Sequence, residues 1–212
     1  SISENSEFYF SEYKGRKIRS IEIIRLNVFG PTIYENENIT TNWVQRAGNH
    51  THIKTRENIL RNNLFFQEGD TIDPIQLADN EILLRNLDFI KDAYIQIMEI
   101  PGSEDLVDIL VITKDIWSLG FSVNFYNITS GSIELYEDNL AGMGHKLEAS
   151  LFINSLYLPS TGYNFSYKID NISNSFIKTR LNYYKAFETE KYGIEIWRRL
   201  HSYNTKYAGQ IG

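Results

Sequence analysis

Acidic side chains near the middle of the chain are the first candidates for catalytic chemistry. Glu134, Glu137 and Asp138 lie close together in the sequence, and paired carboxylates can act as a general acid and a general base. The residues around them alternate between apolar and polar types, so the acids fit the polar face of a strand or a turn better than an active site. The sequence therefore predicts no catalytic residue, and we expect a protein that is not an enzyme.

Two histidines are the strongest candidates for metal ligands. His50 and His52 lie in a polar stretch, and the chain contains no cysteine. A zinc site needs at least three protein ligands, and no third residue has a convincing spacing from these two. We expect both histidines to be exposed to solvent, and the sequence predicts no metal and no cofactor.

Charge and aromatic content divide the chain into two parts. The formal net charge is −6, which argues against a nucleic-acid partner. Residues 1–116 hold 12 Lys+Arg against 19 Asp+Glu, a balance of −7, whereas residues 117–212 hold 9 against 8, a balance of +1. Of the 29 Phe, Trp and Tyr residues, 18 follow residue 116. The two compositions indicate two environments.

The part after residue 116 alternates between apolar and polar residues. The alternation has no error in Leu119–Phe125 and recurs in 146–151, 163–170 and 177–183. Successive side chains of a strand point to opposite faces of a sheet, so each strand has one apolar and one polar face. No run approaches the roughly 18 apolar residues of a membrane-spanning helix. If this chain meets a bilayer, we expect it to do so with strands.

The part before residue 117 has a mixed pattern. The opening residues 1–16 are predicted to form a poorly specified N-terminal arm, and residues 32–53 a long polar insertion. Thr55 is a candidate N-cap for a short helix, and Asp73-Pro74 is a strong start signal for a second one. With strands at 18–29, 93–100 and 106–113, the order is strand, helix, helix, strand, strand.

Over residues 17–115 this order resembles the POTRA (polypeptide-transport-associated) domain. The resemblance depends on apolar positions and one turn that are spread over the whole segment, namely Ile21-Glu22-Ile23, Ile59-Leu60, Phe65-Phe66, Gly69-Asp70, Leu77 to Phe89 and Val107 to Val111. The insertion at about 32–53 departs from the family, in which the first strand and the first helix are joined by a far shorter turn.

The region 117–212 resembles the start of the barrel of the BamA/TamA superfamily of outer-membrane insertases and translocases. The POTRA-like segment passes directly through Asp115-Ile116-Trp117 into a first strand at about 118–127. The second strand, at 131–140, ends in a turn that is similar to the family's Asn-hydrophobic-x-Gly-x-Gly motif, with Asp138, Asn139, Gly142 and Gly144 as its marked residues. Later strands are predicted at 145–155, 161–171, 175–187, 191–202 and from 206 onward.

The predicted fold is therefore an α+β POTRA-like module (β-α-α-β-β) followed by the first six to seven antiparallel strands of a transmembrane β-barrel. A barrel that spans a membrane must close, and bacterial barrels have about eight strands or more. We therefore expect the barrel in this chain to be incomplete. The expected lumen-facing charges are Lys146, Glu148, Lys168, Asp170, Lys178 and Arg180, and the alternate apolar residues would face outer-membrane lipid.

The resemblance implies a mechanism and a set of partners. The first barrel strand would act as a lateral gate at which unfolded outer-membrane or secreted polypeptides pair, through residues Leu119, Gly120, Phe121, Ser122, Val123, Asn124 and Phe125. The POTRA-like module would lie in the periplasm of a Gram-negative-type bacterium and bind clients or accessory subunits along a strand edge.

Three other interpretations remain open at this point. The alternating strands could form a soluble β-sandwich with one buried face. The chain could also belong to a passive channel or structural barrel, or to a membrane anchor or translocator of a fused hydrolase domain.

Overall fold

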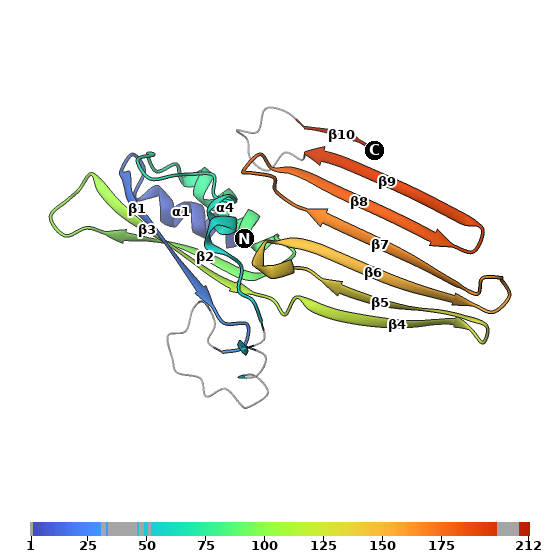
Figure 1. Cartoon of the computed structure of the whole chain (residues 1–212). Helices are drawn as coiled ribbons and strands as arrows, with labels where there is room; N and C mark the ends of the chain where they lie inside the picture. The colour runs from blue at the N-terminus through green and yellow to red at the C-terminus, as the bar shows by residue number, and fades with distance from the viewer. Residues whose placement is uncertain (1, 31–32, 34–45, 47–48, 51, 199–207) are drawn as a thin grey trace. The chain divides into compact units, whose positions relative to one another are not determined.

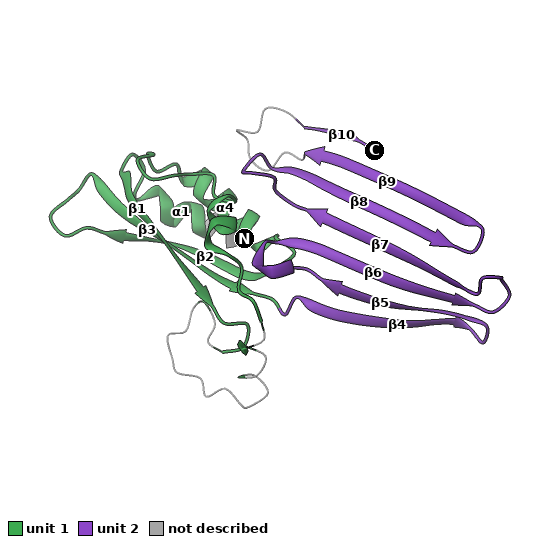
Figure 2. Cartoon of the chain, viewed as in Figure 1, with its two compact units in different colours: residues 1–116, 201–204 green, residues 117–200, 205–212 purple. Residues whose placement is uncertain are grey.

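The computed structural model describes residues 2–30, 33, 46, 49–50, 52–198 and 208–212. The described residues form two compact units, which meet in the sequence at Ile116 and Trp117 (Figure 2). Unit 1 is the part up to Ile116, and unit 2 is the part from Trp117 onward. Most of the predicted insertion at 32–53 lies outside the described residues.

Unit 1 is a three-stranded sheet with helices packed against it (Figure 1). Strand β3 is central, parallel to β1 and antiparallel to β2. Its elements are α1 (Ile2–Ser11), β1 (Lys17–Leu26), α3 (Glu57–Arg61), α4 (Pro74–Arg85), β2 (Ile90–Glu99) and β3 (Leu106–Asp115). Among the described residues, no helix has the length and apolar character needed to span a membrane.

The core of unit 1 lies between the sheet and the helices. Val107, Ile109 and Val111 on the central strand are almost fully buried, because alternate side chains of β3 point toward the helices. Leu77 and Leu84 of α4 are buried against them, at the spacing that puts helical residues on one face. This packing fixes the edge strands β1 and β2 on either side of β3.

Helix starts were predicted with mixed success. Asp73 is the N-cap of α4, and its carboxylate accepts hydrogen bonds from the backbone N–H groups of Ile75 and Gln76, with Pro74 at the first helical position. The prediction for Thr55 was wrong. The short helix α3 has Arg56 at its N-cap position, and the N–H group of Thr55 donates to the buried carboxylate of Asp115.

The opening segment differs from the expected unspecified arm. It forms α1, in which Phe10 is fully buried in the core of unit 1 and Tyr9 packs against the same core. Helices α1 and α4 are neighbours. The aromatic residues that made the segment hard to interpret in the sequence are the ones that attach it to the sheet.

Unit 2 is a single antiparallel sheet of seven strands, in which every strand pairs with its sequence neighbour (Figure 1). The strands are β4 (Leu119–Asn127), β5 (Ser130–Glu137), β6 (His145–Asn154), β7 (Thr161–Ile169), β8 (Ile177–Ala186), β9 (Thr189–Arg198) and β10 (Gly209–Ile211). Each lies within a few residues of its predicted position. Within the described residues the sheet is open, and β4 forms one of its edges.

Candidate functional site

Strand β4, the first strand of unit 2, lies at a free edge of the sheet. One hydrogen bond shows which of its backbone groups point to that edge. The backbone N–H group of Asp138 donates to the carbonyl oxygen of Ser118 at 3.0 Å, and the two residues are directly opposite in the β4–β5 register. In an antiparallel ladder, hydrogen-bonded pairs of residues alternate with pairs whose backbone N–H and C=O groups point away from the partner strand. The alternate residues 120, 122 and 124 therefore bond to β5, and the backbone groups of 119, 121, 123 and 125 point to the free edge.

These outward backbone groups have no hydrogen-bond partner among the described residues. No described group hydrogen-bonds to the outward N–H of Leu119, Phe121 or Val123, and their side chains are also exposed, with Phe121 at 74%. The predicted gate strand thus presents a row of backbone donors and acceptors together with a row of apolar side chains. Such an edge can pair with another strand.

Gly120 gives β4 a close contact with its neighbour. A Cβ atom at Gly120 would lie 2.2 Å from the Cζ atom of Tyr136, which is directly opposite on β5. The ring of Tyr136 therefore occupies the space above the glycine. The ammonium group of Lys146 lies 5.5 Å from the centre of the same ring, a distance at which a cation–π interaction is favourable.

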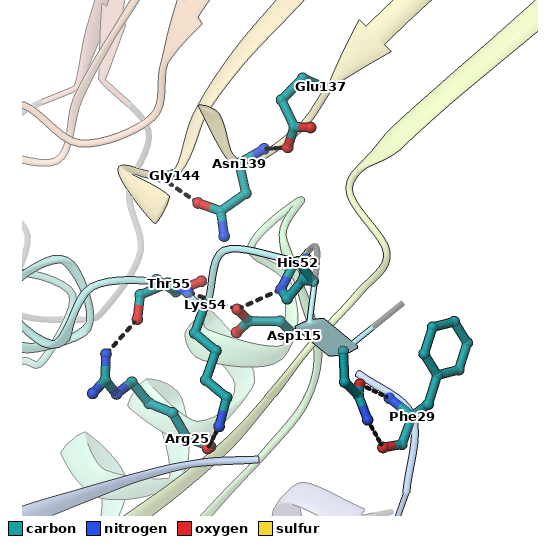
Figure 3. Close-up of polar contacts among 10 residues, drawn as sticks. Arg25, Phe29, His52, Lys54, Thr55, Asp115, Glu137, Asn139 and Gly144 are labelled. Atoms are coloured by element: carbon teal, nitrogen blue, oxygen red, sulfur yellow. Dashed lines mark hydrogen bonds and ion pairs between the residues drawn. The ribbon is translucent and has the colours of Figure 1, made fainter. Parts of the chain in front are cut away.

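The marked residues of the turn after β5 lie in a tight loop. Asn139 is buried, its side-chain oxygen accepts from the backbone N–H of Gly144 at 2.8 Å, and its own N–H donates to Glu137 (Figure 3). Gly142 and Gly144 have positive φ, as does Ala141. Asp138 binds the ammonium group of Lys146 at 3.1 Å. A side chain without an acceptor oxygen at this position would leave the turn without this internal bond.

The six expected lumen-facing charges share one face of the sheet. Lys146 pairs with Lys168 and Lys168 with Arg180 across β6, β7 and β8. Asp170 accepts from both Lys168 and Lys178, while Glu148 binds Lys146. The positive charges are thus interleaved with carboxylates, which lowers the repulsion among them.

Burial on the two faces of unit 2 is opposite to that of a water-soluble sheet. On the polar face, Ser150 and Ser166 are only 8% and 6% exposed. On the apolar face, Leu135 and Phe165 are about half exposed, at 56% and 49%. The β-sandwich interpretation requires a buried apolar face, and the described residues do not provide one.

A second polar cluster lies at the end of unit 1, where β3 ends. The ring of His52 contacts the Asp115 carboxylate, Nε2 to Oδ2, at 3.2 Å, and the N–H of Thr55 donates to the same oxygen at 2.7 Å (Figure 3). The His52 side chain is 4% exposed, so the prediction of solvent exposure was wrong for this histidine. His50 is exposed, and the described residues include no group of three or more potential metal ligands.

The same cluster holds both ends of the insertion. Lys54 donates to the carbonyl of Arg25, and the guanidinium of Arg25 donates to the carbonyl of Thr55 (Figure 3). The side chain of Asn49 exchanges two hydrogen bonds with the backbone of Phe29. Nearby, burial lowers the pKa of Lys114, with a further contribution from the charge of Lys91.

No protein-family model matches the chain. Over 140 residues the sequence is 23% identical to the outer membrane protein assembly factor BamA of Neorickettsia risticii, a match that covers 65% of this chain and 19% of that protein. The chain thus spans about a fifth of the length of that curated relative.

Two solved structures match the chain. The crystal structure of BamA from Haemophilus ducreyi lacking POTRA domains 1-3 matches with a TM-score of 0.51 and 16% identity, over 86% of this chain and 32% of that one. CdiB from Acinetobacter baumannii matches with a TM-score of 0.44 and 13% identity, over 86% of this chain and 32% of that one.

The open antiparallel sheet of unit 2 resembles part of the BamA barrel in fold. The sequence match to BamA, which is an outer-membrane protein, and the fold match confirm the predicted resemblance to the BamA/TamA superfamily.

Proposed function

We propose that this chain is part of an outer-membrane protein that inserts other barrel proteins or translocates a secreted polypeptide. Strand β4 serves as the lateral gate, and an unfolded client pairs with its free edge. The backbone supplies the affinity in such β-augmentation, so little sequence is demanded of the client. No covalent chemistry is needed, and we infer that the protein is not an enzyme.

The observation that carries this proposal is the combination of an open β4 edge with an apolar face that is exposed. A sheet in lipid must satisfy its backbone groups by pairing, because no water is available there. An unpaired edge next to an apolar surface is therefore stable only if a further strand binds. Either the closing strand of the barrel or a client strand satisfies the groups at residues 119, 121 and 123.

The two faces of unit 2 support the same proposal. The apolar side chains would contact lipid, while the charged network around Asp170 would face a water-filled lumen. A Lys or Arg on the lipid face near the midplane costs about 2–4 kcal/mol. This cost selects the orientation in which the six charges point inward.

Unit 1 is proposed to be a POTRA-like module in the periplasm. Its element order, with β1, two helices, β2 and β3, supports this assignment. The BamA structure matches 86% of the chain, whereas unit 2 is less than half of it, so the similarity extends well into unit 1. The partners would be unfolded clients and periplasmic accessory subunits.

The test uses prolines at Val123 and Phe125. Both residues point their N–H groups to the free edge, so the substitutions remove donors for the client while the ladder to β5 keeps its bonds; edge positions tolerate proline. In a strain that depends on the variant, we expect the amount of folded client barrels, measured by gel mobility before and after heating, to fall severalfold.

The matched control is the pair Val123→Thr and Phe125→Tyr, which changes the same side chains but keeps the N–H groups. It should retain most of the activity. Normal client insertion by the double proline variant would contradict the gate proposal. If depletion of the whole protein leaves other folded barrels at their normal level, general insertion fails, and translocation of one client or a passive channel remains.

A further inference from the structure

The outer edge of the sheet in unit 1 is covered by side chains rather than left open. Strand β2 is at the edge, because the sheet order is β1-β3-β2. Side chains bind the backbone groups of Ala93, Ile95 and Ile97, which are alternate residues. In an antiparallel pair, alternate residues point away from the partner strand. These three residues therefore carry the outward groups of β2.

Helix α4 covers the first part of this edge. The carbonyl of Ala93 accepts from the Nε atom of Arg85 at 2.8 Å, and the N–H of Ile95 donates to the carboxylate of Glu81 at 3.0 Å. Arg85 and Glu81 also form an ion pair at 2.8 Å. Glu81 is 1% exposed, so its charge is held in place by these contacts.

Helix α1 covers the next part. The hydroxyl of Tyr9 accepts from the N–H of Ile97 at 3.1 Å and donates to the carbonyl of the same residue at 3.3 Å. The hydroxyl of Ser6 donates to Glu81 at 3.0 Å, which joins the two helices. One hydroxyl thus satisfies both outward groups of Ile97, as a residue of a neighbouring strand would.

We propose that α1 is an autoinhibitory strand blocker: β2 can pair with an extended polypeptide strand only after α1 moves away. Tyr9 occupies the position that the backbone of the added strand would take, so the two cannot bind Ile97 together. The identity of the occupant as a polypeptide rests on the function proposed above, whereas the closure of the edge follows from the contacts alone.

The attachment of α1 is suited to reversible release. The described anchors are the buried ring of Phe10, the ring of Tyr9 and the bonds of Ser6 and Tyr9. Loss of one neutral hydrogen bond, worth about 0.5–1.5 kcal/mol, raises the open population by roughly two- to tenfold.

The first experiment measures amide hydrogen exchange in the full chain, reconstituted in lipid vesicles. In Tyr9→Phe the ring is kept, but the hydroxyl and both of its bonds to Ile97 are lost, so exchange at Ile97 should rise roughly five- to 150-fold. Gln96, which faces β3, should not change. Tyr13→Phe, on the segment that follows α1, is the matched control. Unchanged exchange at Ile97 in Tyr9→Phe would contradict the proposal.

The second experiment measures strand binding. The probe is a fluorescent peptide with the sequence of β4, Leu119–Asn127, extended by lysines for solubility. We expect Tyr9→Phe to bind it several times more tightly than the wild type and Tyr13→Phe do, and Ser6→Ala to show a smaller change in the same direction. Equal binding by all four proteins would overturn the proposal.

The same variants distinguish binding at β2 from binding at a competing site, the edge of β4. If the peptide binds at β4 rather than β2, the prolines at Val123 and Phe125 will abolish binding and Tyr9→Phe will have no effect, which overturns the blocker. Failure of the lateral gate appears instead as normal client insertion by the proline variant. The two proposals therefore fail in different measurements.

Discussion

The two units of this chain treat an exposed strand edge in opposite ways. In unit 1, the outward backbone groups of β2 are bound by Arg85, Glu81 and Tyr9. In unit 2, the outward groups of β4 have no partner among the described residues. Open edges promote unwanted pairing, and natural proteins usually cover or interrupt them. The contrast is consistent with the proposal that a further strand pairs with the β4 edge.

The side chains at the two edges follow the same division. Ala93, Ile95 and Ile97 are buried against the helices of unit 1, whereas Phe121 and Val123 are exposed. An edge strand with exposed apolar residues aggregates in water, but the same strand is stable in lipid once it is paired. If unit 1 lies in the periplasm and unit 2 in the membrane, as proposed, closure by polar side chains is expected in unit 1 and an edge available for pairing in unit 2.

The largest effect on this contrast should come from Phe10→Ala. The ring is fully buried, and loss of a buried Phe destabilises a protein by about 3–5 kcal/mol. We expect α1 to detach, so that the amide of Ile97 exchanges much faster than in the wild type. Hydrogen exchange of the full chain in vesicles measures this residue, with Gln96, which faces β3, as the internal reference.

Phe8→Ala is the control for this change, because Phe8 lies on the same helix and is 74% exposed. It should leave the exchange of Ile97 unchanged. If Phe10→Ala also leaves Ile97 protected, α1 does not cover the edge, and the contrast between β2 and β4 must have another origin.

A medium effect is expected from Gly120→Ala in β4. The new Cβ atom would lie 2.2 Å from the ring of Tyr136, so the ring must move, and overpacking of this kind costs about 1–3 kcal/mol. The midpoint of urea unfolding in vesicles, followed by tryptophan fluorescence, should fall. The double variant with Tyr136→Ala should recover part of the loss.

Gly193→Ala is the matched control, since its Cβ atom would meet nothing closer than 3.7 Å. It should unfold like the wild type. An equal loss of stability in Gly193→Ala and Gly120→Ala would show that glycine itself, and not the space under Tyr136, matters at these positions.

The smallest expected effect is a loss of stability of unit 1 in acid. It arises at strand β1, on the opposite side of β3 from β2. Arg19 of β1 binds Asp108 of β3 and holds the pKa of that carboxyl below its ordinary value of 3.8, with help from Ser20. A lowered pKa stabilises the fold at pH values above 3.8, and this contribution is lost as the pH falls through the lowered pKa. Asp108→Asn should therefore be slightly less stable at neutral pH and show a flatter loss of stability in acid.

Unfolding of unit 1 at pH 7 and pH 3, followed by hydrogen exchange at β1, measures this effect. Glu104→Gln, in the exposed turn between β2 and β3, should behave like the wild type. Acid should loosen β1 without opening β2, so faster exchange at Ile97 in the same pH range would show that the two edges of the sheet are coupled.

The strands and their faces were largely predictable from the sequence. A period of two is a local property of each strand, and the order of charges such as Lys146 and Glu148 shows which face is polar. The start of α4 was predictable for the same reason, because Asp73 and Pro74 act on the backbone next to them.

Contacts between distant residues were not predictable in this way. Tyr136 covers Gly120 only because the β4–β5 register places them opposite each other, and no local pattern gives that register. His52 is buried by Asp115, 63 positions away, and Tyr9 binds Ile97 at a separation of 88. The aromatic content of the opening segment was the one available signal that it docks.

The bonds at the base of the insertion suggest a practical use. Asn49 is hydrogen-bonded to Phe29, and Lys54 and Thr55 are hydrogen-bonded to Arg25. Direct hydrogen bonds therefore join the residues on either side of the intervening segment. Loop length itself has a weak effect on stability, about 0.6 kcal/mol for each doubling. An epitope or biotin-acceptor tag placed between residues 34 and 45 should therefore label the protein without altering either of its sheets.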